Sequence, residues 1–197
     1  MAFFLIFVSA IFVNNVVLSQ FLGICPFLGV SKKIDTALGM GAAVTFVLVV
    51  ATIITYLMQM LLVRFGLEFL QTIVFILVIA ALVQMIEIIL KKVSPSLYQA
   101  LGVFLPLITT NCCVLGVAIQ VAGANYKTCG AEPSLLIGTW YAFCTALGFA
   151  LALVLFAGIR EQLELTDTPK AMKGTPVALL TAGLLAMAFM GVSGVVG

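Results

Sequence analysis

Cys25-Pro-Phe-Leu-Gly-Val30 and Cys112-Cys-Val-Leu-Gly-Val117 carry one pattern, C-x-x-L-G-V, twice within apolar stretches of the chain. The sequence has five cysteines and no histidine, so a cysteine that recurs in matching surroundings is its strongest chemical signal. A free cysteine is most often a small, buried apolar side chain. The repetition instead favours a soft-metal or redox site that two similar halves of the protein build together.

The composition identifies the solvent around most of the chain. Apolar residues make up 64% of the sequence, charged residues make up 8%, and the mean hydropathy is +1.32. These values are typical of an integral membrane protein. A helix needs about 20 apolar residues to cross a bilayer core roughly 30 Å thick. Segments of that kind predict six membrane-spanning helices, at residues 3–22, 39–62, 70–91, 98–121, 134–158 and 175–196.

The basic residues predict the orientation of these helices. The loops after the first, third and fifth segments hold seven of the nine basic residues, and the other two loops hold Arg64 and Lys127. Short cytoplasmic loops retain positive charge, so both termini are expected outside the cell. The stretch 160–164 is expected to be a solvated cytoplasmic helix end. The net charge of +2 gives no case for nucleic-acid binding. The seven residues are Lys32, Lys33, Lys91, Lys92, Arg160, Lys170 and Lys173.

The number of crossings between the two cysteine motifs predicts internal symmetry. The chain crosses the membrane three times between Cys25 and Cys112, and an odd number of crossings inverts the second copy. The sequence therefore predicts an all-α membrane domain with two inverted three-helix repeats, residues 1–95 and 96–197. Inverted repeats of this kind place sites near the middle of the bilayer, at the interface between the halves.

Breaks are expected in the first and fourth helices. Three helix-breaking residues surround Cys25, and an extended Gly23–Ser31 segment is expected to keep this cysteine deep in the membrane. Cys112 follows polar residues that can satisfy backbone groups freed by a break. The breaking residues are Gly23, Pro26 and Gly29, and the residues before Cys112 are Pro106, Thr109, Thr110 and Asn111.

Counting ligands limits the metal site that this chain can supply. Iron-sulfur clusters are usually held by four thiolates. The repeat selects Cys25 and Cys112, and Cys113 is a less favoured ligand because neighbouring residues on a helix point about 100° apart. Cys144 is expected to be a buried apolar residue, and Cys129 to be an unpaired thiol in an outward loop. Two cysteines supply half a cluster. The rest must come from Cys113 and Cys144, which the geometry disfavours, or from a second polypeptide, which is the expected source.

Several polar residues lie in or beside the apolar segments. Asn14, Asn15 and Gln20 are costly in lipid, so they are expected to face protein through hydrogen bonds between helices. Asn14 and Asn15 are also candidate ligands for Na⁺. Glu87 precedes Lys91 by four residues, which favours a helical ion pair. A carboxylate within a membrane is otherwise a candidate for an ion pathway, and that alternative stays open for Glu87.

Three stretches closely resemble the A subunits of bacterial Rnf complexes, and the resemblance extends over nearly the whole chain. A weaker similarity links the chain to the E subunits of the Na⁺-pumping NADH:quinone reductase, although Asn14, Asn15 and Pro26 look more like Rnf. The loop at residues 125–133, with Cys129, departs from the family pattern. The three stretches are Phe12–Lys33, Leu101–Cys112 and Leu180–Met190.

The resemblance implies a membrane component, not catalytic alone, of a complex in the bacterial inner membrane. Such complexes couple electron transfer between ferredoxin and NAD⁺ to translocation of Na⁺ or H⁺. In this family, a homologous six-helix membrane protein of the Rnf E type shares an intramembrane 2Fe-2S cluster with its Rnf A counterpart. By motif, the ligands from this chain are Cys25 and Cys112. The other implied partners are the Rnf subunits that carry flavin and iron-sulfur centres, and membrane lipid.

Two other classes of protein fit parts of the sequence. An inverted-repeat secondary transporter, or an ion-conducting subunit without a redox centre, shares the architecture but does not need the cysteines. A structural membrane scaffold tolerates changes at both Cys25 and Cys112. Iron content in cysteine variants therefore separates these alternatives.

Overall fold

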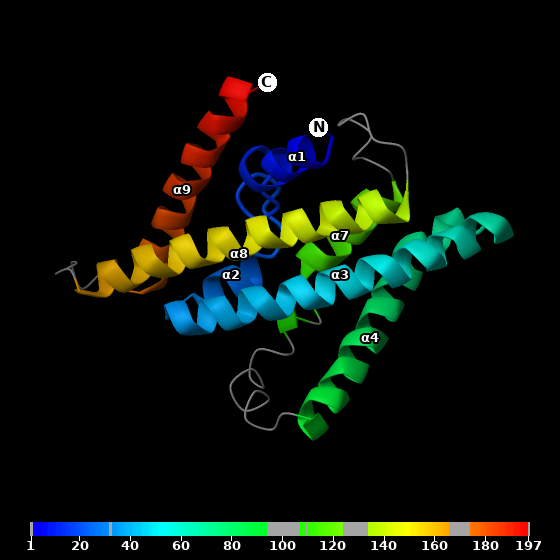
Figure 1. The fold of residues 1–197 in the computed structure, drawn as a ribbon. Coiled ribbons are helices and arrows are strands. Elements are labelled where there is room, and N and C mark those ends of the chain that lie inside the picture. Colours follow the sequence, from blue (N-terminus) through cyan, green and yellow to red (C-terminus); the bar gives the residue numbers. More distant parts are fainter. Residues whose placement is uncertain are drawn as a thin grey trace.

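The computed structural model describes residues 2–31, 33–93, 107–108, 110–123, 134–165 and 174–196. Regular structure in these ranges is helical throughout, and they contain no strand, which confirms the predicted all-α class for this part of the chain. The elements of Figure 1 are α1 (Ala2–Val8), the π-helix η1 (Ser9–Val13), α2 (Ile24–Val30), α3 (Ile34–Phe65), the 3₁₀ helix η2 (Glu68–Leu70), α4 (Gln71–Val93), α7 (Cys112–Ala122), α8 (Leu135–Leu165) and α9 (Thr175–Val196).

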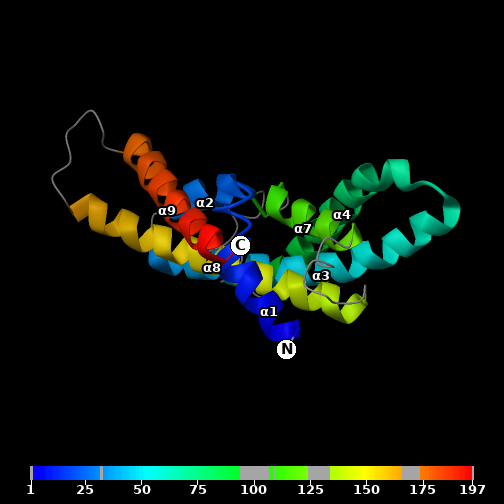
Figure 2. The ribbon, with the colours of Figure 1, turned by 90° about the horizontal axis from the view of Figure 1, so that it is seen from above.

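Two long helices form the centre of the molecule. α3 has 32 residues and α8 has 31, and they run antiparallel, side by side (Figures 1 and 2). Small residues allow them to approach closely where they cross. A Cβ atom on Gly41 would lie 2.9 Å from the Cβ atom of Ala150, so a side chain at Gly41 would push the helices apart. Close backbone approach through small residues is the usual way in which membrane helices pack.

A second repeated sequence marks this crossing. Thr-Ala-Leu-Gly occupies residues 36–39 of α3 and residues 145–148 of α8. Aligning the two copies pairs Gly41 with Ala150, the two residues that meet where the helices cross. Two antiparallel helices meet at equivalent residues if a two-fold axis passes between them.

The helices that follow α3 and α8 diverge to opposite sides. In Figure 1, α4 points downward from the end of α3, and α9 points upward from the end of α8. Gly66 ends α3 in the left-handed conformation, with a φ of +67°, and its N–H donates to the carbonyl oxygen of Val63. One face of α4 is buried, at Phe75, Ile79 and Val83, and this spacing of four residues is that of a helix packed on one side.

Three described helices are long and apolar enough to cross a membrane, namely α3, residues 71–89 of α4, and α8. They match the predicted second, third and fifth segments, but α3 and α8 extend beyond the predicted ends at residues 62 and 158. α9 has the predicted bounds of the sixth segment, although its described apolar part, Thr175–Gly191, is shorter. The apolar helices Phe3–Val13 and Cys112–Ala122 are shorter still, as expected where helices are interrupted.

The first predicted helix is broken, but not where the sequence suggested. Helical structure ends at Val13, and residues 14–23, called the first break below, connect it to α2. The extended segment predicted at Gly23–Ser31 is wrong, because residues 24–30 form α2. Pro26 is the third residue of this helix, where a backbone N–H has no acceptor within the helix, so proline is tolerated. Glycine and proline here mark a helix start rather than its loss.

The fourth predicted helix is also interrupted within its described part. Residues 107–108 are helical, residues 110 and 111, called the second break below, are not, and α7 begins at Cys112. The predicted role of Asn111 is confirmed, since its Oδ1 atom accepts a hydrogen bond from the Cys113 N–H at 3.0 Å. A helix N-terminus leaves its first N–H groups without intrahelical partners, and asparagine is among the best residues to cap them.

Candidate metal centre

The two cysteines of the repeated motif lie where two helices begin. Cys25 is the second residue of α2, and Cys112 is the first residue of α7. The N–H of Gly23, which precedes α2, donates to the Sγ atom of Cys112 at 2.9 Å. Cys25 follows Gly23 by only two residues, so the Cα atoms of Gly23 and Cys25 are at most about 7.6 Å apart. The structure thus brings the starts of both helices together, and Cys25 lies two residues from the point of contact.

The contact between the two helix starts requires glycine. Gly23 has a φ of +80°, a conformation that residues with a side chain rarely adopt. A Cβ atom here would also lie 2.9 Å from the ring of Phe149, 3.1 Å from the Cβ atom of Cys113 and 3.2 Å from Oδ1 of Asn111. A larger residue at position 23 would therefore displace the N–H group that bonds the Cys112 sulfur.

The cysteines differ in exposure. Cys25 and Cys112 are exposed on the surface of the chain, whereas Cys113 and Cys144 are buried with no accessible surface. Cys112 and Cys113 therefore point in different directions, as expected for neighbours at a helix start. Cys144 is a buried residue of α8, in keeping with its expected role as a buried apolar residue. Cys129 lies outside the described residues.

Asn15 holds the first break against α8. Its side chain is fully buried, and its Nδ2 atom donates to the carbonyl oxygens of Gly148 at 2.9 Å and Ile11 at 3.2 Å. Its Oδ1 atom accepts from the N–H groups of Val17 at 3.1 Å and Leu18 at 3.4 Å. The expected hydrogen bonding between segments is thus confirmed for Asn15, and its amide satisfies backbone groups that the break leaves without helical partners.

The later part of the first break runs along α7. Gln120 donates from Nε2 to Oε1 of Gln20, and the hydroxyl of Tyr141 donates to Oε1 of Gln120 at 2.9 Å. Leu22 fills the space beside Gly116, where a Cβ atom would lie 2.5 Å from its Cδ1 atom. Gln20 therefore faces protein, as expected, and these contacts direct the chain toward Cys112.

Arg160 holds the far end of α2. Its Nη1 atom donates to the carbonyl oxygen of Leu28 at 2.9 Å and to the Oγ atom of Ser31 at 3.0 Å. A cation is stabilising at a helix C-terminus, where carbonyl groups lack partners. The expected solvated helix end agrees with the exposed Glu161 and Glu164 near the end of α8, but Arg160 is only partly exposed and bonds protein groups. Sequence reasoning missed this role, because no local signal links Arg160 to a carbonyl 132 residues away.

The other candidate ion-pathway residues lie at separate positions. Unlike Asn15 and Gln20, Asn14 is exposed, so the expectation that its side chain faces protein does not hold within the described part of the chain. Its N–H donates to the carbonyl oxygen of Ser9 at 2.7 Å, which closes the π-helix. Glu87 lies partly exposed on α4. The side chain of Lys91 lies outside the described residues, so the ion pair with Glu87 stays a prediction.

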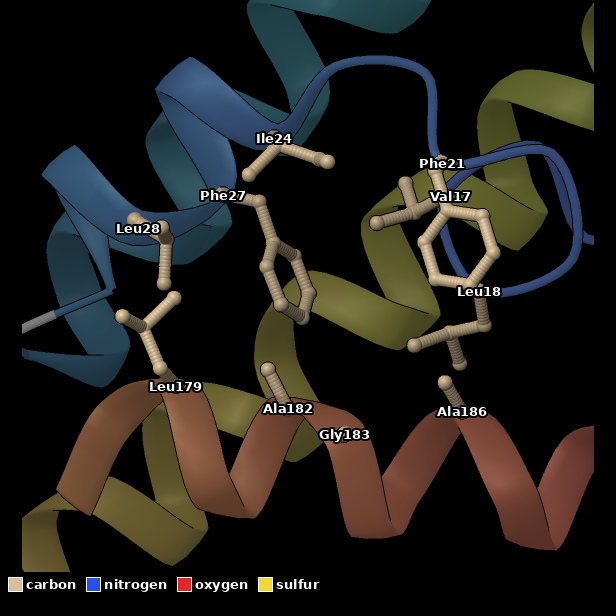
Figure 3. Close-up of a pocket in the computed structure, with 10 residues that line it drawn as sticks. All are labelled: Val17, Leu18, Phe21, Ile24, Phe27, Leu28, Leu179, Ala182, Gly183 and Ala186. Carbon is tan, nitrogen blue, oxygen red and sulfur yellow. The ribbon is translucent and has the colours of Figure 1, made fainter. Parts of the chain in front are cut away.

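An apolar cavity adjoins the helix that carries Cys25. It has a volume of about 210 Å³ and lies between α9, α2 and the first break (Figure 3). Figure 3 shows the ring of Phe27 pointing toward Ala182 of α9, with Leu18 and Leu28 on either side. Its lining is apolar throughout, so this side of α2 offers no ligand to a metal. The thiols and the neighbouring N–H groups are thus the polar part of the site.

The described residues contain no group of three or more histidine, cysteine, aspartate or glutamate side chains that could hold a metal ion. The geometry instead presents two exposed thiols at neighbouring helix starts, and a backbone N–H bonds the sulfur of one of them, Cys112. Such an arrangement can provide two ligands to a soft metal centre that another molecule completes.

Comparison with known proteins places the chain in a family. Residues 3–196 match the family described as Rnf-Nqr subunit, membrane protein. The A subunit of the Na⁺-translocating ferredoxin:NAD⁺ oxidoreductase complex of Acetobacterium woodii is 60% identical over 195 residues, which cover 98% of each chain. The A subunits of the ion-translocating oxidoreductase complexes of Syntrophotalea carbinolica and Pseudomonas paraeruginosa are 58% and 53% identical, over 98% of this chain and 96% of the relative. These matches confirm the resemblance, and the chain belongs to the Rnf-Nqr family of membrane subunits.

Proposed function

We propose that this chain is a membrane subunit of a complex that couples electron transfer between ferredoxin and NAD⁺ to translocation of Na⁺ or H⁺. Support comes from two relatives that align with 98% of the chain. The name of the Acetobacterium woodii relative gives a Na⁺-translocating ferredoxin:NAD⁺ oxidoreductase complex, and that of the Syntrophotalea carbinolica relative gives an ion-translocating oxidoreductase complex. The composition, with 8% charged residues and no histidine, agrees with a role inside the membrane rather than at a soluble catalytic site.

Within this complex, Cys25 and Cys112 supply two of the four ligands of a 2Fe-2S cluster. A homologous six-helix subunit of the Rnf E type supplies the other two. The observation that carries this proposal is the 2.9 Å hydrogen bond from the Gly23 N–H to the Cys112 Sγ atom. It joins the start of the helix that bears one thiol to the other thiol, and both thiols are accessible to a partner.

The residues around the two thiols fit a cluster of this kind. A thiolate is the metal-binding form of cysteine, and a nearby helix N-terminus favours it. α7 begins at Cys112, so the partial positive charge of its N-terminus lies next to this sulfur. The Gly23 N–H adds a direct donor. Together they lower the cost of a negatively charged sulfur ligand within the membrane.

When bound, the cluster supplies one-electron transfer at membrane depth. The chain itself holds the starts of α2 and α7 together through the contact of Gly23 with Cys112. Arg160 and Asn15 fix the two ends of the segment that carries Cys25, since Arg160 bonds the last turn of α2 and Asn15 ties the first break to α8. The cavity beside Phe27 has an apolar lining, so the side of this segment that faces α9 is apolar.

We also propose six membrane spans in two inverted halves, residues 1–95 and 96–197, with both termini outside the cell. The repeated Thr-Ala-Leu-Gly sequence, the meeting of Gly41 with Ala150 and the opposite directions of α4 and α9 support this arrangement. Reporter fusions at each loop test it, and a cytoplasmic N-terminus would contradict it.

The proposed cluster is tested on the purified complex. Iron content and the EPR signal of the reduced complex are compared for the wild type, Cys25→Ser and Cys112→Ser. Each substitution is expected to remove the iron of one 2Fe-2S centre and that centre's contribution to the EPR signal, while the subunits remain assembled. A cluster retained in both variants would contradict the assignment and favour an ion-conducting subunit without a redox centre.

A further inference from the structure

The side chain of Asn111 carries a buried donor without a partner among the described residues. Asn111 is 4% exposed, and its Nδ2 atom makes no hydrogen bond in the described part of the chain. Its orientation follows from its other contact, because the Cys113 N–H requires an acceptor and Oδ1 provides it at 3.0 Å. A buried polar group without a partner costs about 1–3 kcal/mol, and such a group in a native fold calls for an explanation.

The position of this donor indicates the ligand that it serves. Asn111 directly precedes Cys112, and its Oδ1 atom would lie 3.2 Å from a Cβ atom on Gly23. Gly23 is the residue whose N–H bonds the Cys112 sulfur. The unpartnered amide therefore belongs to the same small group of residues as the sulfur ligand and its backbone donor.

We propose that the Asn111 side-chain amide donates a hydrogen bond to a sulfur atom of the bound iron-sulfur centre, either the Cys112 thiolate or an inorganic sulfide. This inference rests on the proposed function. Asn111 is a positioning residue whose amide stabilises the reduced centre more than the oxidised one, because reduction of iron by one electron adds one negative charge to the centre as a whole. Hydrogen bonds to sulfur are among the features that set the potentials of such centres.

A role in capping α7 alone makes a different prediction. Serine is as good an N-cap as asparagine, so Asn111→Ser keeps the acceptor for the Cys113 N–H but lacks the amide. Asn111→Ala removes both functions. If Asn111 were only a cap, the serine variant would behave like the wild type. If its amide bonds the centre, the serine and alanine variants share a change in potential.

The experiment uses the purified complex and a redox titration followed by EPR. Asn111→Ser is expected to retain iron and to shift the midpoint potential downward, with a roughly tenfold change in the redox equilibrium constant, or about 59 mV for one electron. Gln84→Leu is the control, since it removes a side-chain amide from an exposed position of α4 that takes no part in the site. Its potential is expected to equal that of the wild type.

A measurement on the wild-type complex makes the test independent of how the variants fold. With asparagine labelled by ¹⁵N at the side-chain amide, pulsed EPR of the reduced complex is expected to detect a coupling to this nitrogen. Absence of that coupling, or an unchanged potential in Asn111→Ser, would overturn the inference. A wild-type complex without the iron of a 2Fe-2S centre would contradict the proposed function instead.

Discussion

In both helix breaks of this chain, an asparagine bonds backbone groups that lack helical partners, but the two side-chain amides are used differently. In the first break, Asn15 uses both ends of its amide on backbone groups, four hydrogen bonds in all. In the second break, Asn111 uses only its oxygen, on the Cys113 N–H, and its nitrogen has no partner in the described part of the chain. The comparison indicates that the first break is complete as a protein structure, whereas the second retains a donor for a ligand.

Removing the amide of each break is expected to show the largest contrast. Asn15→Ala leaves buried carbonyl and N–H groups without partners and is expected to destabilise the chain by roughly 3 kcal/mol. Asn111→Ser keeps the cap and is expected to cost less than about 0.5 kcal/mol. Thermal unfolding of the purified complex measures both changes. Equal losses of stability at the two positions would break the comparison.

Gly23, whose N–H links the first break to Cys112 after the second break, can be compared with Gly66 as a control. Gly23 and Gly66 both have positive φ values, +80° and +67°, but only Gly23 is crowded by neighbouring atoms. Gly66→Ala is expected to cost about 1 kcal/mol through backbone strain alone. Gly23→Ala adds the contact with Phe149 and is expected to cost about 2 kcal/mol or more.

The variants Gly23→Ala and Gly66→Ala also distinguish an effect on metal binding from an effect on stability. Gly23→Ala is also expected to lower the iron content, because it displaces the N–H that bonds Cys112, while Gly66→Ala retains full iron. Iron analysis beside thermal unfolding measures both effects. Loss of iron in Gly66→Ala would show that general destabilisation, rather than the Gly23 contact, controls occupancy.

A smaller effect is expected where the π-helix before the first break packs on α8. A Cβ atom at Gly148 would lie 3.2 Å from the carbonyl oxygen of Ala10 and 3.3 Å from the Cα atom of Ile11, whereas no described atom lies within 4 Å of one at Gly158. Gly148→Ala is therefore expected to destabilise by roughly 1 kcal/mol. Gly158→Ala, on the same helix, is expected to stabilise by up to about 0.5 kcal/mol through helix propensity. A neutral Gly148→Ala variant would show that this packing is dispensable.

Much of this architecture follows from local sequence. Apolar length predicts α3, α4, α8 and the bounds of α9, because the bilayer requires long apolar helices. Glycine, proline and asparagine predict that helices break near both copies of the motif. The predicted position of the first break is wrong because a proline such as Pro26 is as well suited to a first helical turn as to a helix end.

Contacts between distant segments could not be predicted in this way. Nothing near Arg160 in the sequence reveals that it bonds the last turn of α2, and nothing near Gly23 reveals its bond to the sulfur 89 residues later. Both contacts depend on how α8 and α7 pack against the first break. The repeated motif therefore predicts which cysteines matter, whereas the hydrogen bonds from Gly23 and Arg160 follow only from the packing of distant segments.

Serine substitution of each of the two adjacent cysteines, Cys112 and Cys113, gives the most direct test of the proposed ligand. Each variant replaces one sulfur atom by oxygen at nearly the same place in the chain. The two positions differ because Cys112 is exposed and accepts the hydrogen bond of the Gly23 N–H, whereas Cys113 is buried. In the purified complex, Cys112→Ser is expected to abolish the EPR signal of the reduced cluster, and Cys113→Ser to retain it. A signal that survives in Cys112→Ser and disappears in Cys113→Ser would contradict the account.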